Sequence, residues 1–134
     1  MKARTLVLVV DDEPDQLETL RRGLFLLGLD CLTARGCDEA LAQLTGPGGA
    51  RVGLLLTDLS MPGRSGAELI ERARTARPEL PVLVVTGLAL SPEVMAVRAR
   101  GIPILRKPFT PDQLGLAIAA LLDARQRPNQ GESS

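Results

Sequence analysis

Five short strand-like runs, each followed by a segment with helical spacing, constrain the fold of this chain most. The runs occupy Leu6–Val10, Asp30–Ala34, 54–57, Val82–Thr86 and 102–106. Short runs bounded by Gly, Pro and acidic residues are typical of strands that are buried on both faces of a parallel sheet. Their alternation with helices predicts right-handed crossovers and a single α/β domain with helices on both faces of the sheet.

The predicted helices have recognisable ends. The first begins at Pro14 and ends at Gly28, and Ser91 caps the fourth. The second, third, fourth and fifth helices are expected over 37–44, 67–76, 92–100 and 111–122, with a loop over 45–50. A sheet of five strands in a domain of this size favours the flavodoxin-like order 2-1-3-4-5, although alternation alone does not determine the order. We assign one domain to 1–124 and a flexible C-terminal tail to 125–134.

Composition excludes several classes of function. The formal net charge is zero, and the chain has two Phe and no Trp or Tyr, so we expect no direct nucleic-acid binding and no base-stacking surface. No apolar run has the length of a membrane span, and no signal peptide is recognisable. Cys31 and Cys37 lack metal-ligand spacing and are expected to be buried or half-buried thiols. Because the chain contains no histidine, Ser-His and Cys-His catalysis are excluded.

Polar side chains of a particular kind mark the ends of four predicted strands. Asp11 and Asp12 follow the first strand, Asp58 follows the third, Thr86 ends the fourth and Lys107 follows the fifth. Ligands of open parallel sheets bind beyond the carboxyl ends of the strands, and the first and third strands are neighbours in the expected order. Three carboxylates should therefore converge. Taken alone, Asp11 and Asp12 fit equally well as a cap for the first helix.

Crowded carboxylates raise one another's pKa unless a cation lies among them, and hard oxygen ligands suit Mg²⁺. Asp58 can then attack as an oxygen nucleophile and form an aspartyl-phosphate. The metal and Lys107 would neutralise charge on the phosphoryl oxygens, and Thr86 could donate its hydroxyl to one of them. The residues thus predict a phosphoryl-transfer site.

Four motifs together resemble the receiver domain of two-component response regulators. They are VVDDEP at 9–14, TDLSMPGRSG at 57–66, VVTG at 84–87 and LRKPF at 105–109, and the resemblance runs from Leu6 to about Leu122. It implies that Asp58 is the phosphoacceptor and that Lys107 and Thr86 are the phosphate-binding and switch residues. It also implies a cis Lys107–Pro108 bond. The implied Mg²⁺ ligands are Asp12, Asp58 and the backbone carbonyl of Ser60, with Asp11 bonded through water.

The resemblance further implies a cytoplasmic signalling domain rather than an enzyme, with only self-catalysed phosphotransfer and slow autodephosphorylation. The phosphoryl donor would be the phosphohistidine of a histidine kinase or phosphotransfer protein. Phosphorylation would switch a face made by the fourth helix, the fifth strand and the last helix. That face would bind a downstream protein, with a phosphorylation-dependent homodimer as a further possibility. A stand-alone regulator and a module of a hybrid histidine kinase or larger regulator remain open alternatives.

Two other classes of function compete with this interpretation. A phosphohydrolase of related topology also forms an aspartyl-phosphate, but it needs a second aspartate two residues after the nucleophile, where this chain has Ser60. A degenerate receiver that serves only as a binding domain is the other class. The presence of the complete acidic, hydroxyl and lysine set argues against it.

The chain departs from the family pattern in three respects. Ile104 stands where the family usually has Tyr or Phe, so a rotating aromatic cannot couple the site to the binding face. Segment 101–103 is about one residue short. Ser60 and Leu88 occupy the two positions that set phosphate lifetime in the family, and neither has a carboxylate or amide to orient an attacking water.

We therefore predict that phosphorylated Asp58 loses its phosphate slowly compared with a Ser60→Asn/Leu88→Glu double variant. An amide and a carboxylate near the phosphate would orient the attacking water, which raises the hydrolysis rate. The measurement is the decay of labelled protein in both forms. Equal decay rates would contradict this prediction.

Overall fold

The computed structural model describes residues 5–59, 66–87 and 91–126, and it contains a five-stranded parallel sheet in the order β2-β1-β3-β4-β5. The predicted flavodoxin-like order is confirmed. The strands are β1 (Leu6–Val10), β2 (Asp30–Ala34), β3 (Val52–Thr57), β4 (Val82–Thr86) and β5 (Ile104–Arg106). The helices are α1 (Pro14–Leu26), α2 (Cys37–Thr45), α3 (Gly66–Ala76), α4 (Pro92–Ala99) and α5 (Pro111–Gln126), with a short 3-10 helix, η1 (Gly49–Arg51).

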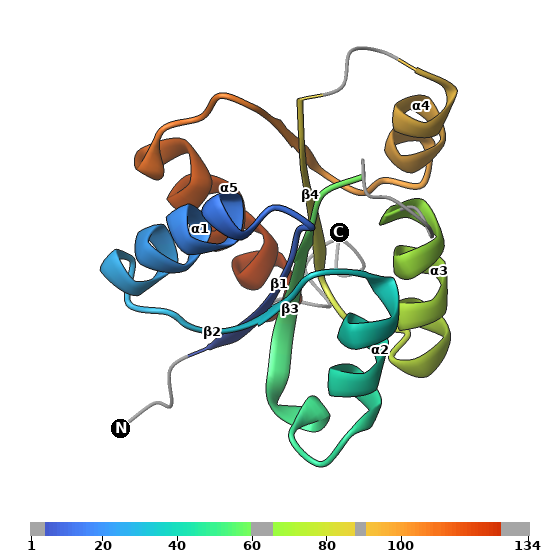
Figure 1. Cartoon of the computed structure of the whole chain (residues 1–134). Helices are drawn as coiled ribbons and strands as arrows, with labels where there is room; N and C mark the ends of the chain where they lie inside the picture. The colour runs from blue at the N-terminus through green and yellow to red at the C-terminus, as the bar shows by residue number, and fades with distance from the viewer. Residues whose placement is uncertain (1–4, 60–65, 88–90, 127–134) are drawn as a thin grey trace.

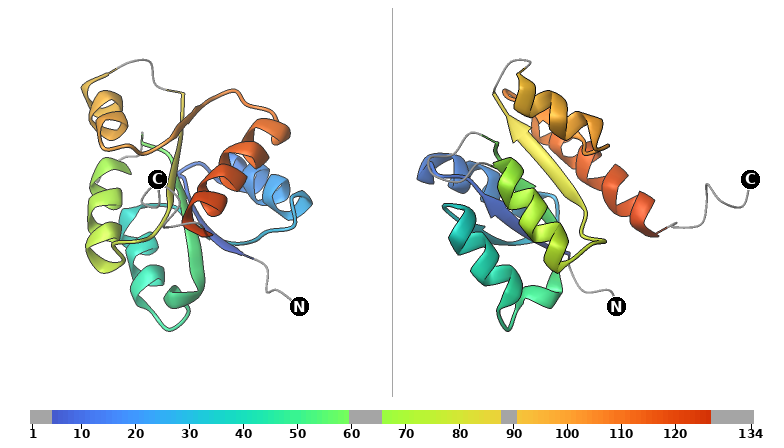
Figure 2. Two further views of the ribbon diagram at one scale, coloured as in Figure 1. Left: turned by 180° about the vertical axis from the view of Figure 1, so that it is seen from behind. Right: turned by 90° about the vertical axis from the view of Figure 1, so that its right-hand side faces the viewer.

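The sheet is the middle layer of three. Helices α1 and α5 cover one face, and α2, α3 and α4 cover the other (Figures 1 and 2). Successive side chains of a strand point to opposite faces, so each central strand contributes to two cores. In β1, Val7 and Val9 pack with α1 and α5, whereas Leu8 and Val10 pack on the other side. Burial of β1, β3 and β4 on both faces explains why their sequences are continuously apolar.

Helix ends follow the signals in the sequence. Gly28, just after α1, and Gly101, just after α4, are the described residues with positive φ, at 84° and 78°. Only glycine adopts this conformation without steric cost, which explains both helix ends. The Ser91 hydroxyl accepts a hydrogen bond from the Val94 N–H at 3.2 Å, as expected of an N-cap.

Several boundaries differ from the sequence-based prediction. Strand β5 begins at Ile104 rather than at residue 102, because Pro103 has no N–H to donate, although its carbonyl still accepts from the Val84 N–H. The expected loop over 45–50 is shorter, since α2 includes Thr45 and η1 begins at Gly49. Helix α5 extends to Gln126, two residues into the expected tail.

Two other expectations can be checked in the described residues. Cys31 is half-buried and Cys37 is buried, and both are free thiols, as predicted. Across residues 5–59, 66–87 and 91–126, no helix has both the length and the apolar character of a membrane span.

Candidate functional site

The carboxyl edge of the sheet positions the predicted site residues through backbone hydrogen bonds. Each bond joins a residue just beyond one strand to the last carbonyl of the neighbouring strand. The Asp11 N–H donates to Ala34 (3.1 Å), the Asp58 N–H to Val10 (3.2 Å) and the Lys107 N–H to Thr86 (3.0 Å). The sheet pairing thus continues one residue past the strands and fixes where these three side chains begin.

The side chain of Lys107 joins the two carboxylates of neighbouring strands. Its Nζ donates to Asp58 Oδ2 at 2.9 Å and lies 3.5 Å from Asp11 Oδ2. Asp11 is 1% exposed and Asp58 7% exposed, while Lys107 is half-buried. The structure therefore brings together residues that are 96 and 49 positions apart in the chain.

Burial and charge act against each other at this edge. Burial raises the pKa of the Asp11 carboxyl, and the Asp58 charge adds to that rise; the Glu13 N–H and Lys107 act in the opposite direction, and the net pKa is raised. For Lys107, burial lowers the pKa, but the carboxylates of Asp58 and Asp11 outweigh it, so the ammonium is held charged. The site combines buried carboxylates with a fixed cation.

The two oxygens of the Asp11 carboxylate have different partners. One carboxylate oxygen, Oδ1, accepts a hydrogen bond from the Glu13 N–H at 3.0 Å, immediately before α1. The other oxygen, Oδ2, faces Lys107. Glu13 is the N-cap residue of α1 and no side chain caps this helix, so Asp11 holds the turn before α1 and is not its cap.

The structure describes the other predicted site residues only in part. Thr86 is fully buried at the end of β4, and its carbonyl is bonded to the Lys107 N–H. Asp12 is half-buried beside Asp11. Ser60 and Leu88 lie outside the described residues, so the proposed carbonyl ligand and the two lifetime positions are not placed. The Lys107–Pro108 bond is cis, as expected.

Ile104, which replaces the usual aromatic, is half-buried in β5. It packs against the core on the side of α2, α3 and α4.

The family model described as the response regulator receiver domain matches residues 7–119. The chain belongs to this family.

Similar proteins agree with that membership. The chain is 34% identical over 125 residues to the C4-dicarboxylate transport transcriptional regulatory protein DctD of Pseudomonas aeruginosa, covering 92% of the chain and 26% of DctD. It is 31% identical over 128 residues to the DNA-binding transcriptional regulator NtrC of Salmonella typhimurium, covering 95% of the chain and 27% of NtrC. The chain thus spans about a quarter of the length of these curated relatives.

Solved structures give the same result. A CheY-like receiver domain protein from Methanospirillum hungatei superposes with a TM-score of 0.86 at 27% identity, covering 94% of this chain and 99% of that one. NtrX from Brucella abortus superposes with a TM-score of 0.85 at 26% identity, covering 97% of this chain and 30% of NtrX.

The donor set at the receiver site fits Mg²⁺ in kind. Asp11 and Asp58 supply hard carboxylate oxygens close enough for the Asp58 charge to raise the pKa of Asp11. Two carboxylates share one ammonium, so an added cation would relieve their repulsion. Within the described part of the chain, however, no three acidic or cysteine side chains group closely enough to hold a metal. Asp12 therefore does not join Asp11 and Asp58 in the arrangement observed.

Gly66 is a site residue that sequence reasoning treated only as a turn former. A Cβ at Gly66 would collide with the Asp58 carbonyl oxygen and would lie 2.7 Å from Leu59 Cα and 3.0 Å from the Asp58 carbonyl carbon. The Gly66 N–H also donates to the Leu59 carbonyl at 3.1 Å. The start of α3 therefore packs directly on the backbone of Asp58, the predicted phosphoacceptor. The sequence contained only a weak signal, a glycine eight residues after Asp58.

We predict that Gly66→Ala slows phosphorylation of Asp58 by about 10-fold or more, because displacement of a reacting group by about 1 Å is costly. Gly49→Ala is the matched control, since its Cβ would collide with the Leu44 carbonyl at the opposite edge of the sheet. Both variants should lose about 1–3 kcal/mol of unfolding free energy from overpacking. Stability is measured by urea unfolding and the rate by labelling with acetyl phosphate. An equal effect of the two substitutions on the rate would contradict a positioning role for Gly66.

Replacing Lys107 with Met is expected to raise the pKa of Asp11 further, because Lys107 lowers it while burial and Asp58 continue to raise it. In the wild type, the pKa of the Asp11 carboxyl in the native state is already raised above its ordinary value of 3.8. Stability should therefore fall as pH rises from 3.8 through the native pKa, and this window should widen in the variant. Carboxyl ¹³C NMR in metal-free buffer measures the titration. The exposed neighbour Arg106→Met is the control, and a downward shift in Lys107→Met would contradict the assignment.

Proposed function

We propose that this receiver domain accepts a phosphoryl group on Asp58 from the phosphohistidine of a histidine kinase or phosphotransfer protein. The observation that carries the proposal is the contact of Lys107 Nζ with Asp58 Oδ2 at 2.9 Å, which sets a fixed positive charge beside a buried carboxylate. Membership of the receiver family supports the same conclusion.

In the proposed reaction, a carboxylate oxygen of Asp58 bonds to phosphorus while the P–N bond of the donor breaks. The electron pair of that bond stays on the imidazole nitrogen, which later takes up a proton. Lys107 moves from the carboxylate toward the phosphoryl oxygens and offsets their charge. Thr86, at the end of the adjacent strand, donates its hydroxyl to one of these oxygens.

Mg²⁺, when bound, would supply the additional positive charge that a phosphorylated carboxylate among acidic groups requires. Asp12 and Asp58 are the proposed carboxylate ligands, with the Ser60 carbonyl, and Asp11 would bond through water. For Asp12 to act as a metal ligand, its side chain must turn toward Asp58, because in the described residues Asp11, Asp12 and Asp58 do not form a group that could hold a metal.

The output would be a change in the face formed by α4, β5 and α5. Thr86 ends the strand that leads to α4, and Lys107 follows the strand that leads to α5, so a shift of either residue reaches that face through the backbone. Because residue 104 is Ile, this route does not use a rotating aromatic side chain.

We further infer that the domain works as a cytoplasmic signalling module rather than an enzyme. The regulators DctD and NtrC are about four times its length, which supports a role as one part of a larger regulator over a stand-alone protein. A phosphohydrolase role is not supported, because β3 and the residues just after it contain no acidic side chain other than Asp58.

The test is phosphorylation with acetyl phosphate and Mg²⁺, followed by intact mass measurement. The wild type should gain one phosphoryl group, and Asp58→Asn should gain none, because an amide oxygen is not a comparable nucleophile. Asp30→Asn, at the opposite edge of the sheet, is the control and should behave as wild type. Labelling of Asp58→Asn at the wild-type rate would refute the proposal, and sustained turnover of p-nitrophenyl phosphate would favour a phosphohydrolase instead.

A further inference from the structure

A hollow with two arginines lies at the edge of the sheet opposite Asp58. It has a volume of about 350 Å³, and its lining includes Thr5, Arg51, Val52, Arg77 and Leu122. These residues come from the amino ends of β1 and β3, the segment just after α3 and the last turns of α5. Its volume lies within the range of about 300–1,000 Å³ that is typical of small-molecule sites.

A bulge in the pairing of β1 with β3 forms part of the wall. Leu6 pairs with Val52 and Val7 pairs with Leu54, so Gly53 is an extra residue of β3. An extra residue bends its strand and disrupts the ladder locally. Because Gly53 lines the hollow, the irregular part of the sheet lies at this site.

Arg77 is held in place beside the hollow. Its Nη1 donates to the Gly49 carbonyl of η1 at 2.9 Å, and its side chain is half-buried. This hydrogen bond uses one of the five N–H donors of the guanidinium. The charged group is therefore fixed and has further donors for a ligand.

Arg51 supplies a second guanidinium, and the charge of the pair is not neutralised. Arg51 ends η1 directly before β3 and is exposed. Within residues 5–59, 66–87 and 91–126, neither Arg51 nor Arg77 forms an ion pair, and the lining of the hollow contains no acidic residue. Elsewhere, helical arginines do bind glutamates of their own helix, as in Arg21, Arg22 and Arg72.

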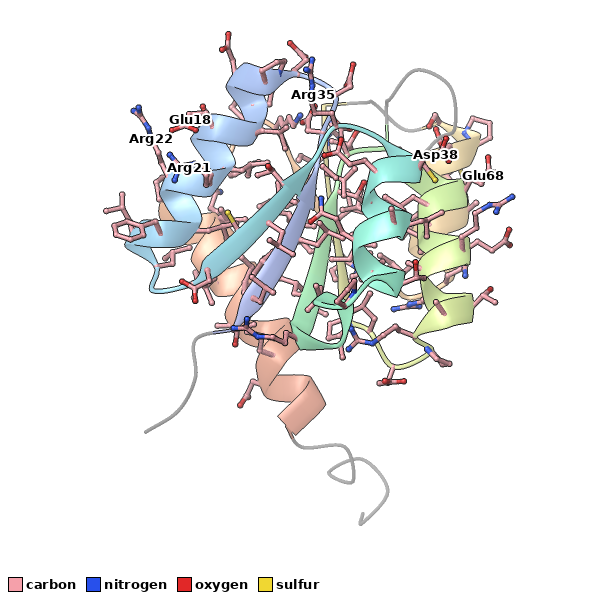
Figure 3. The ribbon with its side chains drawn as sticks, turned by 60° about the horizontal axis from the view of Figure 1, so that its bottom comes forward. Glu18, Arg21, Arg22, Arg35, Asp38 and Glu68 are labelled. Atoms are coloured by element: carbon pink, nitrogen blue, oxygen red, sulfur yellow. The ribbon has the colours of Figure 1, made fainter. Side chains whose placement is uncertain are left out.

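Figure 3 brings this edge of the sheet toward the viewer. The labelled acidic side chains Glu18, Asp38 and Glu68 lie in the upper part of that view, away from the start of β3 and the end of α5. Asp38 and Glu68 are in the first turns of α2 and α3, toward the Asp58 edge. These three carboxylates therefore do not offset the positive charge of the hollow.

Two guanidinium groups without a carboxylate are suited to a ligand with two negative charges. Each guanidinium can bind phosphate oxygens through two parallel N–H donors. A phosphate monoester carries about −1.5 to −2 charges at pH 7 and presents three acceptor oxygens, which is enough for two guanidinium groups. The half-buried side chain of Leu122 offers an apolar contact to the organic part of such a ligand.

We propose that this hollow binds a small phosphate monoester, with Arg51 and Arg77 on two sides of the phosphate group. The site is separate from the one proposed for phosphorylation. Strand β3 has six residues at about 3.3 Å each, so the hollow and Asp58 lie about 20 Å apart.

The first test is a titration of the ¹⁵N-labelled chain with glycerol 3-phosphate in Mg²⁺-free buffer, followed by two-dimensional NMR. We expect saturable shifts centred on the amides of 49–53 and 77, with half-saturation below about 1 mM. Glycerol, which lacks the phosphate, is the matched control and should cause no shift. Shifts centred on Asp58 and Lys107 instead, or no saturation by about 10 mM, would overturn the proposal.

Succinate distinguishes a phosphate site from a carboxylate site. It carries two negative charges but no tetrahedral group. We expect it to bind at least about 10-fold more weakly than glycerol 3-phosphate, because a single phosphate can engage both guanidinium groups. Equal affinity would show that the hollow recognises charge alone and would overturn the phosphate assignment.

Substitution of Arg51 tests the site without disturbing the fold. Arg51→Gln should weaken glycerol 3-phosphate binding by about 10-fold or more, and Arg51→Lys by less, since lysine keeps the charge but not the paired donors. Arg51 is exposed, so thermal unfolding should be unchanged. Arg98→Gln, an exposed position on α4, is the matched control and should bind as the wild type does. Equal weakening by Arg51→Gln and Arg98→Gln would indicate general attraction to positive charge and would contradict the proposal.

Arg77→Gln should also weaken binding by about 10-fold or more. This variant should lose some stability as well, because the Gly49 carbonyl loses its partner. Urea unfolding identifies the conditions in which the variant is folded, and the NMR titration is then repeated there. A folded Arg77→Gln chain that binds glycerol 3-phosphate as tightly as the wild type would show that the hollow is not the binding site.

Discussion

One ammonium group between two buried carboxylates is the interaction on which the functional edge of this molecule depends. Lys107 Nζ reaches both Asp58 and Asp11, whose charges would otherwise face each other with little solvent between them. Removal of one partner from such a set is costly, because it leaves a buried charge uncompensated. The same arrangement places a fixed positive charge 2.9 Å from the carboxylate of Asp58.

The negative charge of the two carboxylates exceeds the positive charge of the ammonium group. Asp11 and Asp58 carry two negative charges against the single positive charge of Lys107. A phosphoryl group on Asp58 would add further negative charge. A divalent cation would therefore stabilise the site before phosphorylation and would stabilise it more afterwards. The carboxylate oxygens of the site are suitable ligands for such a cation.

Helix α5 is part of the surface that we propose for output, and it also has an exposed apolar side. It follows β5 and Lys107, so it belongs to the proposed output face with α4 and β5. Its outer side carries Leu116, which is 72% exposed.

The sequence by itself determined the elements and the chemistry of the site. Short apolar runs bounded by Gly, Pro and acidic residues are typical of strands in a parallel sheet, and Asp11, Asp58 and Lys107 are predicted site residues because each follows a predicted strand. Tertiary structure decided what depends on distance across the chain. The sharing of Lys107 between two carboxylates and the packing of Gly66 on the Asp58 backbone each join residues through space. Local periodicity reports which side of a helix is apolar, but only packing shows whether another part of the molecule covers it.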